Sequence, residues 1–262
     1  MIPGVLLALT LATMPDNPGD AILRRAEDTV HRGLGDPDPN EAAKAFAQAA
    51  ARYDELRRSG INNAALSRNQ GNASLLAGNL PAAILAYRRG LRLAPADQGL
   101  REALSCAREQ VVYSSPQALG RPRVDWPLWL PRPSTGAQYV TALFLHCLGC
   151  LMVARWWLTR GAGLLPAAAG CWMIAAILAV VLVRENREAR ADVEKPVAVI
   201  AADDVVLRRG NGPAYPAAYE TPLHRGVESR IRFIRGDWVQ IELAGGEVGW
   251  VPRRALLSDA VS

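Results

Sequence analysis

The side chains best suited to chemistry in this chain are its 3 histidines and 4 cysteines. The tightest grouping is His146-Cys147-Leu148-Gly149-Cys150, whose two cysteines resemble a redox or metal-binding pair. No second pair lies near it to complete a four-ligand site, and cysteine is apolar enough to be common in hydrophobic segments. His31 and His224 lie in other regions, so spacing supplies no Ser/His/Asp or Cys/His set. We therefore predict no catalytic residue, no metal and no cofactor, and we expect the chain not to be an enzyme.

The cysteine pair lies within the longest apolar stretch of the chain, which predicts two membrane-spanning helices at residues 137–158 and 161–183. Each run is close to the roughly 20 helical residues that cross a bilayer core. Only Arg155, Arg160 and a Gly-Ala-Gly turn separate them, so they should form an antiparallel hairpin. The flanking soluble parts then lie on the same side of the membrane. The alternative is a buried helical pair inside a large soluble core, although the flanking sequences look too small to enclose one.

Charge and composition limit the partners. The 262 residues leave room for two or three domains, and the net charge of +5 comes almost entirely from arginine. The arginines are scattered, which argues against nucleic acid and fits a surface that tolerates membrane lipid. Arginines lie both in the short turn and on the outer flanks of the hairpin, so the positive-inside rule leaves the orientation open.

Three segments outside the hairpin are predicted to be connections or targeting sequence. Residues 1–14 form a short apolar run that fits a signal peptide or an uncleaved anchor, and an ordinary segment is the third alternative. Residues 15–39 are predicted to be a linker with one helix at Ala21–Arg32. Residues 114–136 form a linker rich in Pro and Trp, and residues 184–195 form a charged linker.

Residues 40–113 have a helical period, with apolar residues recurring every three or four positions. Within them, a set of small, aromatic and helix-ending residues follows the spacing of a tetratricopeptide repeat (TPR) of about 34 residues. This set is Gly71, Gly78, Ala83, Tyr87 and Pro95, while Ser67, Gln70 and Ser74 depart from the pattern. The resemblance implies a TPR-like array of helical hairpins whose groove binds a protein partner, with Asn72 and Tyr87 as contact candidates. The first helix of the earlier repeat is expected to be degraded or absent.

Residues 196–262 change to a period of two and predict five short strands in the ranges 197–200, 205–208, 229–234, 238–243 and 249–251. Leu207, Arg208 and Gly249 belong to segments that resemble the bacterial SH3-like (SH3b) domain, which implies a small closed barrel. Relatives of that domain bind peptides or cell-wall peptides. The resemblance suggests a ligand face that is made of Tyr215, Tyr219, Trp238 and Trp250. The alternative is that these aromatic residues only build the barrel.

The sequence therefore predicts a multidomain membrane protein with TPR-like helices, a two-helix transmembrane hairpin and an all-β SH3-like barrel. This order of parts resembles the BatE-type proteins of the Bat aerotolerance operon. The resemblance implies an envelope protein acting with von Willebrand A-domain (VWA) membrane proteins and a MoxR-type ATPase. The signal peptide and the SH3-like domain predict an inner-membrane location with both soluble domains periplasmic. The expected function is that of an adaptor. A peptidoglycan-binding sensor and an accessory subunit of an envelope enzyme or transporter are the alternatives.

Overall fold

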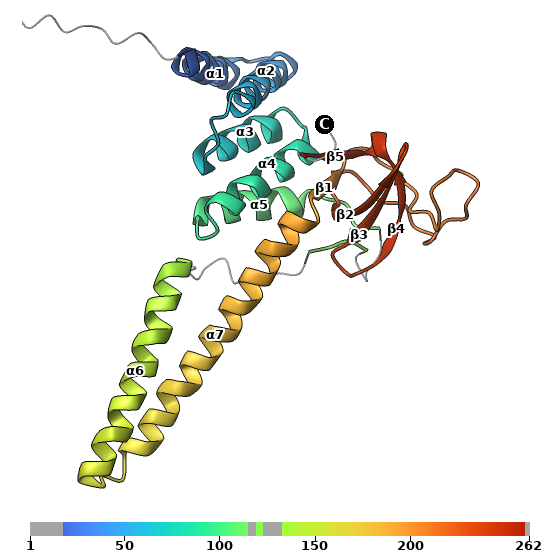
Figure 1. Ribbon diagram of the computed structural model, residues 1–262. Helices are drawn as coiled ribbons and strands as arrows, with labels where there is room; N and C mark the ends of the chain where they lie inside the picture. Colours follow the sequence, from blue (N-terminus) through green and yellow to red (C-terminus); the bar gives the residue numbers. More distant parts are fainter. Residues whose placement is uncertain (1–17, 115–118, 123–132, 260–262) are drawn as a thin grey trace, which may run out of the picture.

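The computed structural model describes residues 18–114, 119–122 and 133–259 (Figure 1). The predicted signal or anchor at residues 1–14 and most of the Pro/Trp linker lie outside the described residues. The helices are α1 (Pro18–Gly35), α2 (Pro39–Arg58), α3 (Ala64–Leu76), α4 (Leu80–Leu93), α5 (Gln98–Glu109), α6 (Thr135–Thr159) and α7 (Leu164–Glu194). The strands are β1 (Val197–Ile200), β2 (Glu228–Arg235), β3 (Trp238–Leu243), β4 (Val248–Pro252) and β5 (Leu256–Ser258), and a 3-10 turn, η1 (Arg253–Ala255), precedes β5.

Four of the soluble helices begin where a short polar side chain can cap them. Asp38, Asn63, Asn79 and Asp97 precede α2, α3, α4 and α5, and each side chain accepts a hydrogen bond from a backbone N–H in the first turn. Such caps satisfy N–H groups that have no partner inside the helix. The cap positions therefore fix where each helix starts, close to the starts predicted from the sequence.

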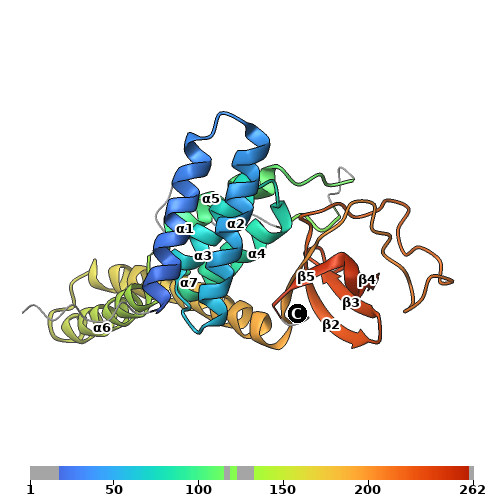
Figure 2. The same cartoon turned by 90° about the horizontal axis from the view of Figure 1, so that it is seen from above.

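The first helix of the array differs most from its prediction. Residues 18–35 form one helix that packs against α2, and Figure 2 shows the two side by side. Helix α1 is the packing partner of α2. The repeat spacing had placed this partner in the Gly-Asp-Pro segment, where we expected it to be degraded or absent. A Cβ atom on Gly33 would lie 2.9 Å from the ring of Phe46, so this glycine allows the two helices to approach closely. The helix predicted at Ala21–Arg32 is thus confirmed with longer bounds, and it forms half of a helical hairpin where a linker was predicted.

The hairpin of α3 and α4 is held by the pair that the repeat pattern identified. Gly71 lies directly against the ring of Tyr87, where any Cβ atom would overlap the ring. Tyr87 is 1% exposed, and its hydroxyl donates a hydrogen bond of 2.8 Å to Oδ1 of Asn72. Gly71 and Tyr87 therefore act together to set the spacing of these two helices.

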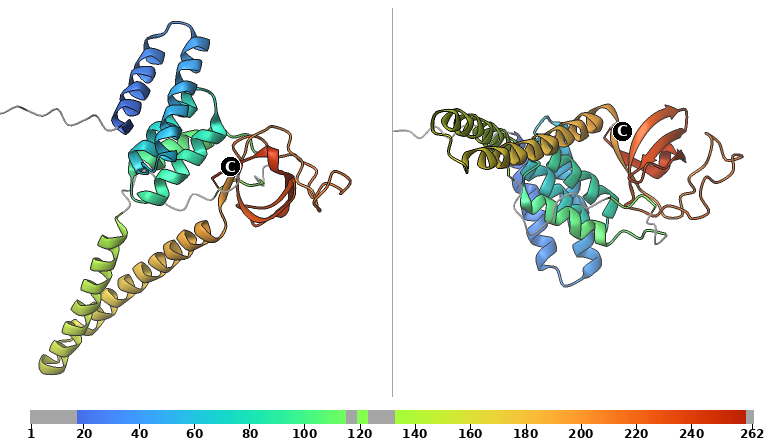
Figure 3. Two further views of the ribbon diagram at one scale, coloured as in Figure 1. Left: turned by 45° about the horizontal axis from the view of Figure 1, so that its top comes forward. Right: turned by 90° about the horizontal axis from the view of Figure 1, so that it is seen from below.

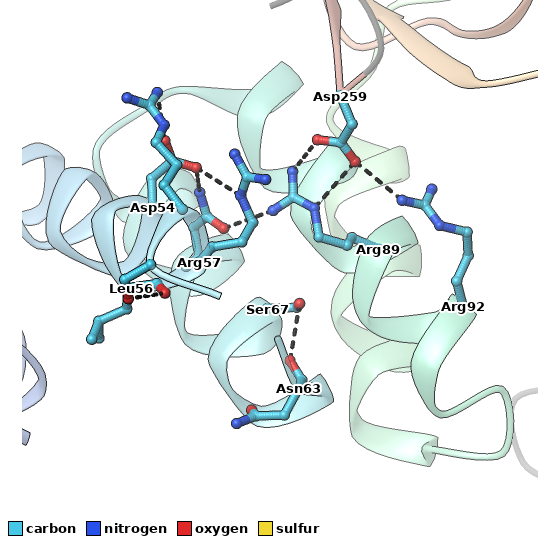
Figure 4. A network of polar contacts seen from close by, with 11 residues as sticks. Asp54, Leu56, Arg57, Asn63, Ser67, Arg89, Arg92 and Asp259 are labelled. Atoms are coloured by element: carbon cyan, nitrogen blue, oxygen red, sulfur yellow. Dashed lines mark hydrogen bonds and ion pairs between the residues drawn. The ribbon is translucent and has the colours of Figure 1, made fainter. Parts of the chain in front are cut away.

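A chain of polar contacts crosses the array from α2 to the end of the sheet (Figure 4). Gln70 on α3 donates to Asp54 at 3.2 Å and accepts from Arg89 on α4 at 2.8 Å. Arg89 in turn pairs with the carboxylate of Asp259, just after β5, and Arg92 reaches the same carboxylate at 3.1 Å. Burial raises the pKa of the Asp259 carboxyl, but the hydrogen bonds and charges of the two arginines outweigh burial and hold the pKa below its usual value. Gln70, a departure from the repeat pattern, is thus explained by this polar chain.

We expect Gln70→Leu to lower the free energy of unfolding by about 1–3 kcal/mol, the usual cost of leaving buried polar groups without a partner. The leucine would remove a hydrogen-bond partner from both Asp54 and Arg89, and Arg89 is only 7% exposed. Urea unfolding of the full-length protein in detergent micelles would measure the change. Gln110→Leu, at the exposed end of α5, is the control and should change the free energy by less than about 0.5 kcal/mol. An equal effect of both variants would contradict the role of Gln70.

The strands form one antiparallel sheet in the order β4-β3-β2-β1-β5. Strands β1 and β3 have the predicted bounds, whereas β5 was not predicted because its three residues are too few to show alternation. The predicted strand at 205–208 makes only isolated bridges, to Leu223, Ala217 and Trp250. No ladder joins β4 to β5 within the described residues, so the sheet does not close into the predicted barrel.

Helices α4 and α5 share a hydrophobic core with the sheet, while α1, α2 and α3 pack around a separate buried cluster that includes Ala49 and Tyr53. The cluster that contains Ile84 and Leu100 continues without a break into Val199, Val227 and Ile241 of the sheet region. At the boundary, Glu228 on β2 accepts two hydrogen bonds from Arg108 on α5, at 2.6 and 3.0 Å. The two predicted soluble domains therefore pack as one body.

Helices α6 and α7 project from this body as a hairpin that narrows toward its turn, as Figures 1 and 3 show. Thr135–Thr159 and Leu164–Arg184 are each long and apolar enough to cross a membrane, and only 11% of each apolar window is buried within the protein. This low burial argues against the alternative of a helical pair inside a soluble core. Arg160 ends α6 in a left-handed conformation with φ of 52°, and its guanidinium lies 4.8 Å from the centre of the Trp156 ring. Residues 184–194, predicted to be a charged linker, continue α7 as helix.

Candidate functional site

Alternation along β3 separates the two faces of the sheet. Val239, Ile241 and Leu243 are buried, while the residues between them point outward. Trp250 on β4 and Phe233 on β2 both lie opposite Gln240 in the ladders, so the three form a row across the outer face. Trp238 lies two residues from Gln240 on that same face. The outer face of the sheet therefore presents a partly exposed aromatic surface.

A cavity of about 510 Å³ opens beside Trp238. Its walls come from three places: the segment after β1, the start of β3, and the end of β4 with η1. The lining residues are Ala202, Asp204, Val205, Val206, Arg208, Pro213, Trp238, Pro252, Arg254 and Ala255. An indole, two prolines and two guanidinium groups are thus brought together around one opening.

The backbone around Arg208 is held firmly. Its N–H donates to the carbonyl of Trp250 at 2.9 Å, and the N–H of Trp250 donates back at 2.8 Å. The Arg208 guanidinium donates to the carbonyl of Tyr215 at 2.7 Å. Asp204 adopts a left-handed conformation with φ of 57°, which is uncommon outside glycine, although aspartate tolerates it better than most residues.

The chemistry of the lining favours binding. Arg208 and Arg254 outnumber the one carboxylate, Asp204, so the cavity favours an anionic group. The Trp238 ring and the prolines offer flat apolar surfaces, which suit an extended peptide segment. Besides the Asp204 carboxylate, the lining contains no histidine, cysteine, serine or lysine.

The structure separates the four aromatic residues that the sequence grouped as a ligand face. Trp238 and Trp250 lie on the same outer face, and only Trp238 lines the cavity. Tyr215 and Tyr219 lie in the long connection between β1 and β2 and are 49% and 37% exposed. Tyr215 packs against Gly210 and positions Arg208 through its carbonyl.

The two helical candidates, Asn72 and Tyr87, lie in the α3–α4 hairpin and do not line the cavity beside Trp238. Burial, followed by the charge of Cys106, raises the pKa of Tyr87 to about 12, so its phenol keeps its proton and bonds to Asn72. Tyr87 is therefore part of the packing, and a partner would reach Asn72 more readily, because Asn72 is exposed.

Sequence reasoning missed Asp204, Pro213, Phe233, Pro252 and Arg254. Phe233 belongs to a strand that was predicted, but a bulge between Ile231 and Phe233 shifts the register, so simple alternation assigns it to the wrong face. Pro252 and Arg254 directly follow the Gly-Trp-Val segment, and their place beside Trp238 depends on the pairing of β3 with β4. Only the spatial pairing of strands brings these residues together.

The four cysteines lie on helices, whereas His224 lies in the connection between β1 and β2, with its Nδ1 3.7 Å from Oδ1 of Asp203. Cys106 is on α5, and the Cys147 and Cys150 pair is on α6 with His146. Over the described ranges, no group of three or more His, Cys, Asp or Glu side chains is placed to hold a metal ion. Comparison with protein-family models, curated proteins and solved structures finds no match to this chain.

Proposed function

We propose that this chain is a non-catalytic membrane-anchored adaptor that binds protein partners in the bacterial cell envelope. In this proposal, α1–α5 are a TPR-like array, the sheet region is an SH3-like module, and α6 and α7 are the anchor. The shared core of the array and the sheet carries the proposal. This core joins α4 and α5 to the sheet that carries the aromatic face, and the body so formed is attached to one apolar hairpin.

The ligand that best fits the sheet surface is a peptide segment with a carboxylate. The carboxylate would pair with Arg208 and Arg254, while the neighbouring residue would stack on Trp238. The resemblance to BatE-type proteins supports VWA-domain membrane proteins and a MoxR-type ATPase system as partners. The predicted signal peptide and the SH3-like domain support the inner membrane as location, with the soluble body on the periplasmic side.

Orientation is the first test, because periplasmic partners require a periplasmic body. Cys106 is exposed on α5 and is a natural reporter for the helical array, and Asp237→Cys places a second reporter in the exposed turn between β2 and β3. We expect a membrane-impermeant maleimide to label both positions in spheroplasts. Protection of both until the membrane is lysed would place the body in the cytoplasm and remove periplasmic partners from the proposal.

The cavity beside Trp238 also favours one alternative, a sensor that binds peptidoglycan, because wall peptides carry carboxylates. Sedimentation of the full-length protein with purified sacculi separates the two functions. An adaptor for protein partners should stay in the supernatant. Sedimentation that Trp238→Ala reduces about tenfold or more, while Tyr219→Ala does not, would instead support the sensor.

A further inference from the structure

The mid-membrane part of α6 carries an arrangement that the adaptor function does not use. His146 and Cys150 are four residues apart and therefore lie on the same side of the helix, with Nε2 of His146 and Sγ of Cys150 separated by 3.9 Å. Both side chains are exposed on the surface of the hairpin, where lipid would surround them. A polar group in the hydrocarbon layer is costly unless another group satisfies it.

The separation of these two atoms is close to what one metal ion requires. Zinc binds histidine nitrogen at about 2.0–2.1 Å and cysteine sulfur at about 2.3 Å in tetrahedral geometry, which places the two ligand atoms about 3.6 Å apart. A shift of a few tenths of an ångström would bring this pair into position. Two ligands form half of a structural site, and the chain supplies no third ligand among its described residues.

We propose that His146 and Cys150 form half of a zinc site, completed by the same pair from a second copy of this chain. Two copies inserted with the same orientation hold these residues at the same depth, as a two-fold axis along the membrane normal requires. Each thiol loses its proton on binding, so two protons leave for every Zn²⁺ bound. The two thiolates cancel the charge of the ion, and the site is therefore neutral, as a low-dielectric environment favours.

A wide, open apolar surface lies next to the ligand pair. A hollow of about 620 Å³ begins at Cys150 and continues toward the turn of the hairpin. It is lined by Cys150, Val153, Ala154, Trp157, Leu158 and Trp172. His146, Cys150, Val153 and Trp157 recur at helical spacing, so the ligands and the hollow share one stripe of α6. The Trp172 indole donates to the carbonyl of His146 at 3.4 Å and fixes this part of α6 against α7.

The test uses the full-length protein purified in detergent under reducing conditions, with Zn²⁺ added or removed by a chelator. We expect a dimer that binds one zinc ion per two chains and dissociates when zinc is removed. His146→Ala and Cys150→Ala should each weaken zinc binding by more than about a hundredfold, since losing a group that only orients a ligand already costs about 10–100-fold. Both side chains are exposed, but the His146 ring also lies 6.5 Å from the Trp172 ring between centroids, so Cys150→Ala is the variant that tests ligation with the least loss of packing.

Cys147→Ala is the matched control, because Cys147 neighbours the site but lies off its stripe, and Cys171→Ala serves as a second control on α7. Both should keep the zinc stoichiometry and the dimer. Substituting Co²⁺ for Zn²⁺ gives an independent readout, since tetrahedral thiolate ligation produces strong visible absorption that Cys150→Ala should abolish. Zinc uptake that is unchanged in Cys150→Ala, zinc bound to a monomer, or a dimer that persists in chelator would each overturn the proposal.

Discussion

Glu228→Ala is expected to lower the free energy of unfolding by about 3 kcal/mol. Glu228 is 6% exposed and joins the sheet to two helices, through Arg108 at 2.6 Å and Arg88 at 3.4 Å. The alanine would leave two guanidinium groups beside the shared core without this carboxylate. Their side chains are 27% and 26% exposed, so water can solvate them in part, and the cost should fall at the lower end of the range for broken buried pairs.

The measurement is urea unfolding of the full-length protein in micelles, followed by far-UV ellipticity for the helices and by hydrogen–deuterium exchange of peptides from β1 to β5 for the sheet. Because α4 and α5 share a core with the sheet, both signals should shift together to lower urea. Glu242→Ala is the matched control: Glu242 lies on the outer face, and its partners Lys195 and Arg232 are 38% and 39% exposed. Such an exposed pair contributes about 0–1 kcal/mol. A large shift for Glu242→Ala, or none for Glu228→Ala, would contradict the assignment.

Gly226→Ala is expected to destabilise the protein by about 2–5 kcal/mol, from two separate causes. Gly226 has a φ of +92°, which costs an L-residue about 1–2 kcal/mol. A Cβ atom there would also lie 2.8 Å from Cγ2 of Val111 and 3.2 Å from Cδ2 of Leu80, and crowding of a packed core costs about 1–3 kcal/mol. Leu80 begins α4 and Val111 follows α5, so the added Cβ atom would crowd the contact between the helical array and the sheet region.

Gly246→Ala separates these two causes. Gly246 has nearly the same backbone conformation, with φ of +93°, but nothing lies within 4 Å of its Cβ position. Gly246→Ala should therefore lower the free energy of unfolding only by the cost of the backbone conformation, about 1–2 kcal/mol. The difference between the variants, measured in the same unfolding experiment, gives the cost of crowding at the interface. Equal losses would mean that the helices do not press against this turn.

The sequence predicted those features that depend on local spacing. The apolar runs identify α6 and α7, the repeat spacing of Gly71 and Tyr87 identifies the α3–α4 hairpin, and alternation identifies β3. The sequence placed a helix at Ala21–Arg32, within α1, but did not join that helix to the repeat, because counting back one repeat of about 34 residues from Gly71 reaches Pro37, in the short connection between α1 and α2. The α1–α2 hairpin is also an antiparallel helix pair with one close contact, but that contact joins Gly33 and Phe46, whereas in the α3–α4 hairpin it joins Gly71 and Tyr87.

The interface and the candidate site could not be predicted, because they are made by residues distant in sequence. Arg108 and Glu228 are separated by 120 positions, and Arg89 and Asp259 by 170. Nothing in the local pattern of either pair marks its partner. The same holds for the cavity, where Arg208, Trp238 and Arg254 meet only after the strands pair.

Helix α7 continues without a break from its apolar window toward the sheet. The apolar window ends at Arg184, the helix runs on to Glu194, and only Lys195 and Pro196 precede β1. Residues 185–194 therefore form a helical spacer of about 15 Å. Each added residue would lengthen this spacer by about 1.5 Å and turn its end by about 100° around the helix axis. Lys195 and Pro196 are not helical, so a rotation of α7 reaches the aromatic face of the sheet only through this two-residue connection.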